Sequence, residues 1–287
     1  MTATPRPAPA ATRLARRAQA SPAAYGLLIV VILASVFPLW WSFVIGSKDA
    51  AAINSGSVSL IPGGNFLENA RTVVATVPFW KAFGNSIIVS TAVAGSVVLL
   101  STLAGFAFAK LRFRGREALL VVVVATMAVP TQLGIVPLFI VMSRLGWVGS
   151  VGAVIVPGLV NAFGVFWMTQ YLREALPDEL IEAARVDGCS VLRTFWNIAL
   201  PASRPGAAML GLFTFIATWT NFFWPFIVLD PGNPTLPVAL QQLQAAYYVD
   251  YSLVLAGVVL AALPLLVLFA VAGRQLVSGI MQGAVKG

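Results

Sequence analysis

Few side chains in this sequence are suited to catalysis. The 287-residue chain has no histidine and a single cysteine, Cys189, so it lacks the commonest general base and metal ligand and cannot form an internal disulfide. None of its lysines stands between a glycine and a serine or threonine, as a phosphate-binding P-loop requires. An intramembrane serine or aspartyl protease would need a histidine or two aspartates within apolar segments, and neither is present. The sequence therefore predicts no catalytic residue, no metal site, no bound cofactor and no ATP hydrolysis by the chain itself.

The spacing that points most directly to a function lies between residues 172 and 205. Pro177–Glu179 has the form of a first helical turn, where proline is tolerated and acidic side chains are favourable. Gly188 can adopt the left-handed conformation that ends a helix, and Ser190 can cap a second short helix. Pro201 is expected to end that second helix. Such a loop is either a solvated connection or a docking element for another protein.

The same loop has features suited to contact with a partner. Ala183 and Ala184 would let a helix approach another surface closely, and Gly188 permits a sharp turn that a Cβ atom would obstruct. Glu182 offers a carboxylate to a hydrogen-bond donor, although an acid here also suits the first turns of an ordinary helix. Cys189 fits a small packing residue better than a reactive thiol.

The remaining composition is that of a membrane protein. Hydrophobic residues make up 59% of the chain and charged residues 10%, with a mean hydropathy of +0.89, whereas soluble domains are about 25% charged. A helix needs about 20 apolar residues to cross the hydrocarbon core. Pro130, Pro137 and Pro157 are expected to kink such helices. Six stretches qualify and predict an all-α integral membrane fold: residues 25–46, 85–109, 118–142, 151–171, 206–229 and 252–272.

Orientation follows from the distribution of the 18 Lys and Arg residues. Most of them lie before the first span, between the second and third, between the fourth and fifth, and after the sixth, so these parts should be cytoplasmic. The net charge of +8 therefore indicates orientation in a membrane and not nucleic-acid binding. The predicted organisation is a mobile cytoplasmic tail over residues 1–24, a six-span core over 25–275 and a cytoplasmic C-terminal tail over 276–287.

The loop pattern resembles the EAA motif of bacterial ABC importer permeases. Three residues separate Ala184 from Gly188, and nine more separate Gly188 from Ile198. Stretches such as Met127–Pro130 and Asn221–Pro225 are similar to the carbohydrate-uptake branch, and residues 276–287 resemble the tail of its maltose-type second permease. In that family an ATPase docks on this loop, which implies an ATPase-coupling role for Glu182, Ala183, Ala184, Asp187, Gly188, Ile198, Leu200 and Pro201.

The resemblance also implies the architecture and the partners. It implies a type I ABC importer permease with six spans and both termini cytoplasmic, lying in the bacterial inner membrane and forming half of the translocation pore. The expected partners are a second homologous permease, two ATPase subunits that bind ATP and Mg²⁺, an extracellular solute-binding protein, lipid and a sugar. The chain itself would be a transport subunit and not an enzyme.

Two further sets of residues are candidates for function. Trp219, Asn221, Phe222 and Phe223, near the outer end of the fifth predicted span, would stack on sugars or else pack between helices or against lipid. In the family that the chain resembles, the C-terminal tail reaches toward the ATPase dimer, which implies contacts from Gln282, Gly283 and Lys286. The alternative for the tail is a frayed end.

Two other classes of protein stay open. An ion-coupled carrier usually needs an intramembrane carboxylate, which the predicted spans lack, although backbone carbonyls can also bind Na⁺. Its uptake would collapse with an uncoupler and need no ATPase. A membrane scaffold would show no ATP-dependent transport at all.

Overall fold

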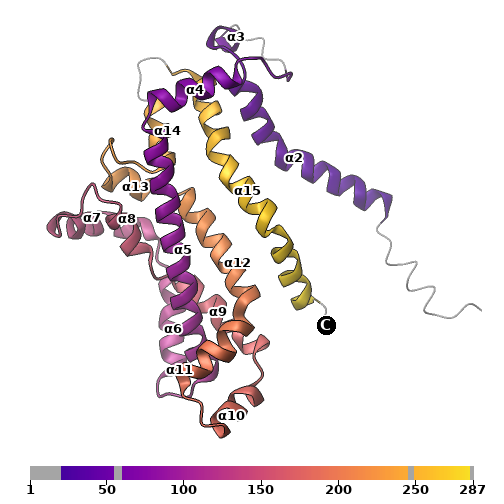
Figure 1. Cartoon of the computed structure of the whole chain (residues 1–287), viewed down its shortest axis with the longest axis vertical. Helices are drawn as coiled ribbons and strands as arrows, with labels where there is room; N and C mark the ends of the chain where they lie inside the picture. The colour runs from indigo at the N-terminus through magenta and orange to yellow at the C-terminus, as the bar shows by residue number, and fades with distance from the viewer. Residues whose placement is uncertain (1–20, 55–59, 245–248, 285–287) are drawn as a thin grey trace, which may run out of the picture.

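A computed structural model describes residues 21–54, 60–244 and 249–284, and the regular elements within these ranges are all helical (Figure 1). In chain order they are α2 (Pro22–Gly46), α3 (Ala50–Asn54), α4 (Phe66–Thr76), α5 (Phe79–Lys110), α6 (Arg116–Thr126), η1 (Thr131–Gly134), α7 (Ile135–Arg144), α8 (Gly152–Gly158), α9 (Ala162–Ala175), α10 (Asp178–Val186), α11 (Val191–Thr194), η2 (Phe195–Ala199), α12 (Leu200–Trp219), α13 (Phe223–Val228), α14 (Leu236–Gln241), η3 (Gln242–Gln244) and α15 (Tyr251–Ala284).

Helix α5 is the axis of the core, and α9 and α12 pack along it (Figure 1). Val97, Met168 and Leu210 are buried where these three helices meet. Gly105 lies at the crossing of α5 and α9, where an added Cβ atom would stand 2.7 Å from Cβ of Met168 and 2.8 Å from its carbonyl carbon. Small residues allow membrane helices to approach this closely.

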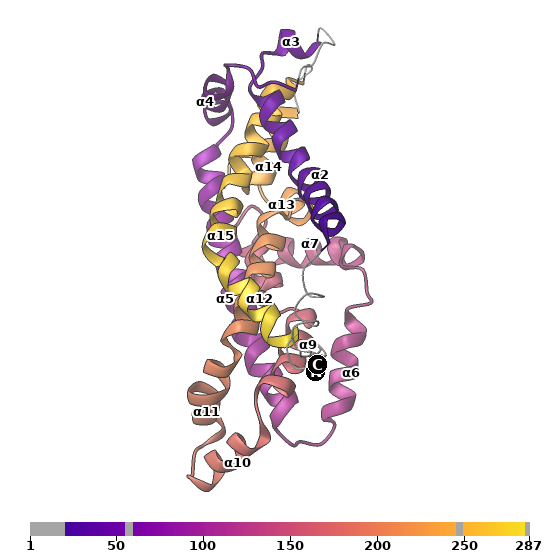
Figure 2. The same ribbon diagram turned by 90° about the vertical axis from the view of Figure 1, so that its right-hand side faces the viewer.

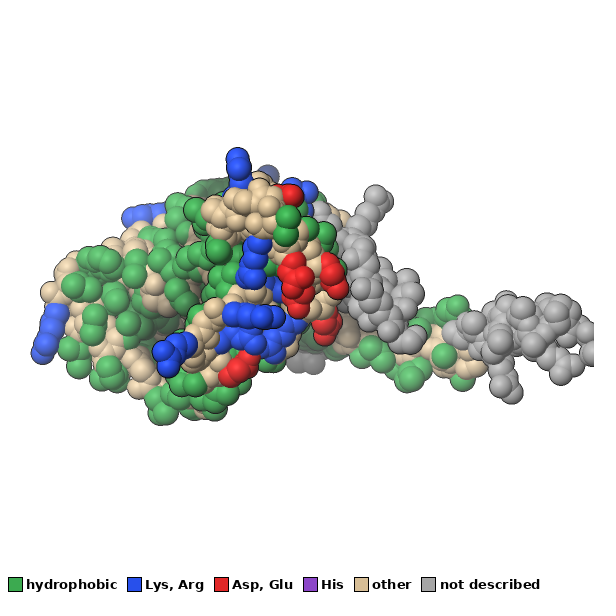
Figure 3. Space-filling model, turned by 90° about the horizontal axis from the view of Figure 1, so that it is seen from below, with side chains coloured by type: hydrophobic (Ala, Val, Ile, Leu, Met, Phe, Trp, Pro, Cys, Tyr) green, Lys and Arg blue, Asp and Glu red, His purple; other side chains and the backbone are tan. Residues whose placement is uncertain are grey.

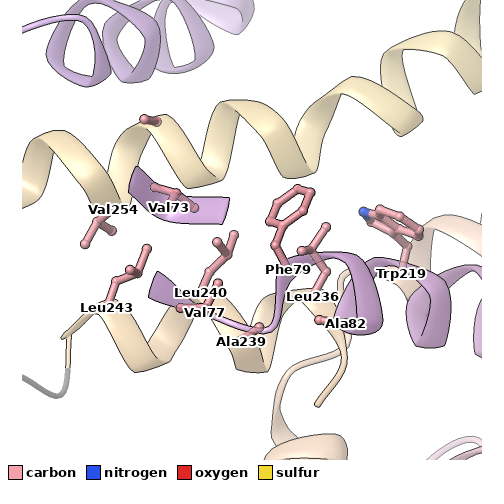
Figure 4. Packing of buried hydrophobic residues seen from close by; sticks show 11 residues of the cluster. Val73, Val77, Phe79, Ala82, Trp219, Leu236, Ala239, Leu240, Leu243 and Val254 are labelled. Atoms are coloured by element: carbon pink, nitrogen blue, oxygen red, sulfur yellow. The ribbon is translucent and has the colours of Figure 1, made fainter. Parts of the chain in front are cut away.

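Two more apolar clusters close the ends of this core. At the end that carries α4 and α14, side chains from α5, α12 and α15 surround Phe79 and Leu236 (Figure 4). At the opposite end, Phe106 of α5 and Leu172 of α9 pack against Ile181 of α10. The short helix α10 is therefore attached to the ends of two core helices.

Helix α2 leans away from α5 and α12 and contacts α15 and α4 (Figures 1 and 2). Only 11% of its most apolar stretch is buried. A continuous apolar surface of this size is not stable in water. It requires lipid or another apolar protein surface around it.

Four helical segments in the described part of the chain are long and apolar enough to span a membrane, or five if the bent pair α6 and α7 forms one span. The four are Pro22–Gly46, Phe79–Lys110, Gly152–Ala175 (α8 and α9 together) and Tyr251–Val271. The predicted spans 25–46, 85–109 and 252–272 are confirmed within α2, α5 and the first two-thirds of α15. The predicted span 151–171 corresponds to α8 and α9, with a break after Gly158. The number six is not confirmed, because α12, with Arg204 and two prolines near its start, is not among these spans.

The predicted third span over 118–142 corresponds to α6, η1 and α7, which are bent at a break between them. Helix α6 ends at Thr126, and the following helical segment turns by 86°. The break contains Pro130, which has no N–H to donate and disfavours helical geometry in the residue before it. The expected kink is therefore present, but it is sharp enough to divide the segment in two.

The predicted limits of the fifth span, residues 206 and 229, are wrong. Helix α12 runs from Leu200 to Trp219, and the separate helix α13 follows after Thr220–Phe222. A helix continued through Pro225 would bring its ring against the carbonyl of Asn221, four residues earlier. The chain therefore changes direction before the proline.

Candidate functional site

The loop that joins α9 to α12 holds α10, whose two ends follow from local chemistry. Pro177 precedes the helix, and Asp178 and Glu179 occupy its first turn. At the other end Gly188 has φ of +71°, its N–H donates to the carbonyl of Arg185 at 3.0 Å, and the next N–H donates to Ala184 at 2.9 Å. These two bonds form the Schellman motif, so the predicted left-handed role of Gly188 is confirmed.

Only one of the two adjacent alanines faces outward. Ile181 and Ala184 are 5% and 4% exposed and face the core, whereas Glu182 and Ala183 are exposed. Residues three apart lie on the same side of a helix, which explains this division. The expectation that both alanines allow close approach to a partner is therefore corrected: Ala184 allows α10 to pack closely on its own chain.

The second helix of the loop begins as predicted but does not end as predicted. Ser190 caps α11, its Oγ accepting from the N–H of Arg193 at 3.3 Å. Pro201 was expected to end this helix, yet α11 continues through the π-helical segment η2 directly into α12. Pro201 lies in the first turn of α12, where a missing N–H is tolerated. Ile198 and Leu200 are half-buried against the cluster around Phe106.

An ion pair fixes the start of α10 to the end of α5. Nζ of Lys110 donates to Oδ1 of Asp178 at 2.7 Å, and the Lys110 side chain is only 6% exposed. This hydrogen bond and the lysine charge lower the pKa of the Asp178 carboxyl below its ordinary value of 3.8, so Asp178 is ionised at neutral pH. Figure 3 views this end of the molecule, where Lys and Arg side chains gather beside Asp and Glu side chains.

The sequence reasoning missed an exposed apolar surface on both sides of Gly188. Val186 is 88% exposed, Leu192 61% and Trp196 50%. The signal was present, since α10 is a short amphipathic helix that ends in a large apolar residue directly before the turn. Together with Glu182, Ala183 and Asp187, these side chains form what we call the α10–α11 surface.

The four residues predicted near a substrate path do not form one surface. Trp219 is 3% exposed, and its indole N–H donates to the carbonyl of Ala261 at 3.1 Å. It lies within the cluster of Figure 4, in agreement with the alternative of packing between helices. Asn221 and Phe223 are exposed, and Phe222 stacks on Phe226 with a centroid distance of 5.0 Å.

A cavity of about 610 Å³ lies beside Trp219. Its walls come from α12, α14 and α15, with Phe222 at one side and Gln241 and Gln244 among the polar groups. Among the described residues, no charged side chain lines it. Aromatic rings beside amide groups suit the apolar faces and hydroxyl groups of an uncharged sugar.

The residues predicted to form a C-terminal tail contact are mostly helical. Helix α15 continues to Ala284 and includes Gln282 and Gly283, whereas Lys286 lies outside the described residues.

The arrangement of helices has a close counterpart of known structure. A chain from the crystal structure of a bacterial ABC transporter involved in the import of the acidic polysaccharide alginate superposes with a TM-score of 0.75, covering 94% of this chain and 99% of that one at 22% identity. This chain therefore shares the fold of a chain of that ABC transporter.

Sequence comparison then gives the family. Residues 97–276 match the family described as binding-protein-dependent transport system inner membrane component, and the chain belongs to it. The arabinooligosaccharides transport system permease protein AraQ of Halalkalibacterium halodurans is 32% identical over 91% of this chain and 95% of its own length. The lactose transport system permease protein LacG of Rhizobium radiobacter is 32% identical over the same shares. The sn-glycerol-3-phosphate transport system permease protein UgpE of Shigella flexneri is 29% identical over 89% of this chain and 94% of its own length.

Proposed function

We propose that this chain is a permease subunit of an ATP-driven sugar importer in the bacterial inner membrane. The family and the relatives named for saccharide transport support the class. The observation that carries the proposal is the α10–α11 surface, where Glu182 and Ala183 lie beside exposed apolar side chains that need a partner. That partner is an ATPase subunit, which binds ATP and Mg²⁺ and hydrolyses the nucleotide.

The contacts of α10 explain how movement of the ATPase would reach the membrane helices. Ile181 packs against Phe106 of α5 and Leu172 of α9, and Lys110 holds Asp178. After α10, the loop continues from α11 through η2 into α12, and these three segments follow one another without a break. A displacement of the α10–α11 surface therefore moves the ends of three core helices as one body, which suits a rigid-body change between inward-open and outward-open states.

Six membrane passages with both termini cytoplasmic are proposed for the assembled subunit. The third passage is the bent α6–α7 pair, and the fifth is α12. The exposed surface of α2 would be covered by lipid or by a second homologous permease, with which this chain forms the pore. The solute-binding protein would dock at the opposite end from α10, over residues 47–84 and 230–251.

The cavity beside Trp219 is a candidate section of the sugar path. Its uncharged lining favours a neutral saccharide over a phosphorylated or acidic one, because a buried anion requires a cationic or hydrogen-bonding partner. Gln282, Gly283 and Lys286 are proposed to contact the ATPase dimer from the C-terminal end.

Co-purification from native membranes tests the proposal. The wild-type chain should bring down a second permease and an ABC ATPase, whereas Glu182→Gln and Gly188→Val should lose the ATPase and keep the second permease. Gly146→Val is the matched control, because Gly146 also has a positive φ, +67°, but lies after α7. A chain that purifies alone and transports under an ion gradient would overturn the proposal in favour of a carrier.

A further inference from the structure

A group of positive charges lies beside α10 and is not explained by ATPase coupling. The connection between α5 and α6, residues 111–115, carries arginines on both sides of Phe113, and Arg116 begins α6. Between this connection and α10 is a hollow of about 250 Å³. Its charged lining consists of Lys110, Arg112, Arg116 and Arg185 facing Asp178 and Glu182.

Ion pairs account for only part of this charge. Lys110 is paired with Asp178, and Arg116 donates to the adjacent Glu117 at 2.8 Å. Neither Arg112 nor Arg185 forms an ion pair within the described ranges of the chain. The guanidinium groups of Arg112 and Arg185 come from different elements and line one hollow. Both still have N–H groups that can donate hydrogen bonds to a ligand. Guanidinium groups bind phosphate oxygens in bidentate geometry.

The adjoining surface indicates what kind of phosphate would bind there. A second, more open hollow of about 470 Å³ shares Arg112 and Arg116 with the first and is also lined by Phe113, Ala118 and Glu117, whose carboxylate is paired with Arg116. Within the next two turns of α6, Leu119, Val121 and Val122 are 52%, 67% and 59% exposed. The exposed apolar surface of α6 thus begins one turn after the arginines.

Because the arginines are followed after one turn by the exposed apolar surface of α6, the 111–115 connection lies at the boundary of the membrane. An exposed apolar membrane helix lies against hydrocarbon or against an apolar surface of another membrane subunit, and in both cases its first polar residues lie near the level of the lipid head groups. Phe113, 42% exposed and in contact with Phe108 at 5.9 Å between centroids, suits the same interfacial level. A ligand with an anionic head and apolar chains matches both hollows and the surface of α6.

We propose that Arg112 and Arg185 bind the phosphate of an anionic phospholipid, whose acyl chains lie along α6. Arg112 belongs to the α5–α6 connection and Arg185 to α10, so the bound head group links the two elements. The lipid thereby holds α10 in the position from which it meets the ATPase. Basic pockets between membrane helices are established sites for acidic head groups in other proteins.

Lipid titration tests this site. The full chain, with the subunits that accompany it, is placed in phosphatidylcholine nanodiscs, and short-chain phosphatidylglycerol is added while native mass spectrometry and thermal unfolding are followed. Saturable binding with a rise in the unfolding midpoint is expected. Arg112→Gln combined with Arg185→Gln should weaken binding about tenfold or more, since each charge-assisted bond contributes on the order of one tenfold step. Arg112→Lys should weaken it less.

The control is Arg71→Gln, an exposed arginine on α4 at the other end of the molecule (Figure 1), which should bind the lipid like wild type. The proposal is overturned if no saturable binding occurs, if the double variant binds as well as wild type, or if inorganic phosphate alone gives the same stabilisation. It is also overturned if the double variant loses the ATPase while lipid binding is unchanged, because an acidic segment of that partner is then the ligand.

Discussion

Nζ of Lys110 lies 2.7 Å from Oδ1 of Asp178, joining the last residue of α5 to the first residue of α10 across 68 positions of sequence. The lysine is nearly buried and the aspartate is exposed, so the pair holds α10 from its inner side.

Removal of the Asp178 carboxylate should destabilise the protein in a pH-dependent way. The pKa of Asp178 is lowered in the folded state, chiefly by its hydrogen bond to Lys110. A lowered carboxyl pKa contributes stability above the unfolded-state pKa, and this contribution is lost as pH falls through the folded-state pKa. The unfolding midpoint of Asp178→Asn should therefore lie below wild type at neutral pH and converge with it in acid. Glu174→Gln, at an exposed position, is the control. The prediction is contradicted if the difference in unfolding midpoint between Asp178→Asn and wild type is as large in acid as at neutral pH.

Substitutions at Gly188 should follow the left-handed preference of the new residue. With φ at +71°, asparagine should be tolerated best, then alanine, and valine worst, with a cost of about 1–2 kcal/mol for residues that disfavour this region. Two quantities are measured for each variant: its unfolding midpoint and the amount of ATPase that co-purifies with it. Gly232 has open space around it and no positive φ, so Gly232→Val should behave as wild type. If asparagine and valine at Gly188 had equal effects, the positive φ at this position would not be their cause.

Two glycines of α5 should respond in opposite ways to alanine. At Gly105 the added methyl group would meet the backbone of α9 at 2.8 Å, whereas nothing lies within 4 Å of a Cβ atom at Gly95. Gly105→Ala should cost about 1–3 kcal/mol through forced separation of the helices. Gly95→Ala should be neutral or stabilising, because alanine favours helix more than glycine does. Chemical unfolding in detergent measures both, and similar values for the two would show that the α5–α9 crossing adapts easily.

Changes at Trp219 should act on stability before substrate affinity. The buried indole packs against Phe83 and Phe215 and donates to Ala261. Trp219→Phe should cost about 1 kcal/mol from the lost hydrogen bond, and Trp219→Ala about 3–5 kcal/mol. Trp80, which is 70% exposed, supplies the control Trp80→Phe. If Trp219→Phe raised the transport KM with no loss of stability, a direct sugar contact would replace the packing role.

Much of the loop between α9 and α12 was predictable because its signals are local. The acids of the first turn, the glycine at the helix end and the serine cap each act on backbone groups within four residues, and α10 begins and ends where they indicate. The core-facing side of α10 was not recognised, because the burial of Ile181 depends on Phe106, Leu172 and Leu176, which come from α5 and from α9 and its end.

The helical and apolar character of the chain, its lack of histidine and the membrane-spanning length of α2, α5 and α15 could all be predicted from the sequence. These properties follow from composition and from apolar run length, which a linear sequence displays directly. The 86° turn between α6 and α7, the end of α12 at Trp219 and the pairing of Lys110 with Asp178 became known from the three-dimensional structure. Each of these depends on how distant segments pack or where a proline ring meets a neighbouring carbonyl, and apolar run length contains no information about such contacts.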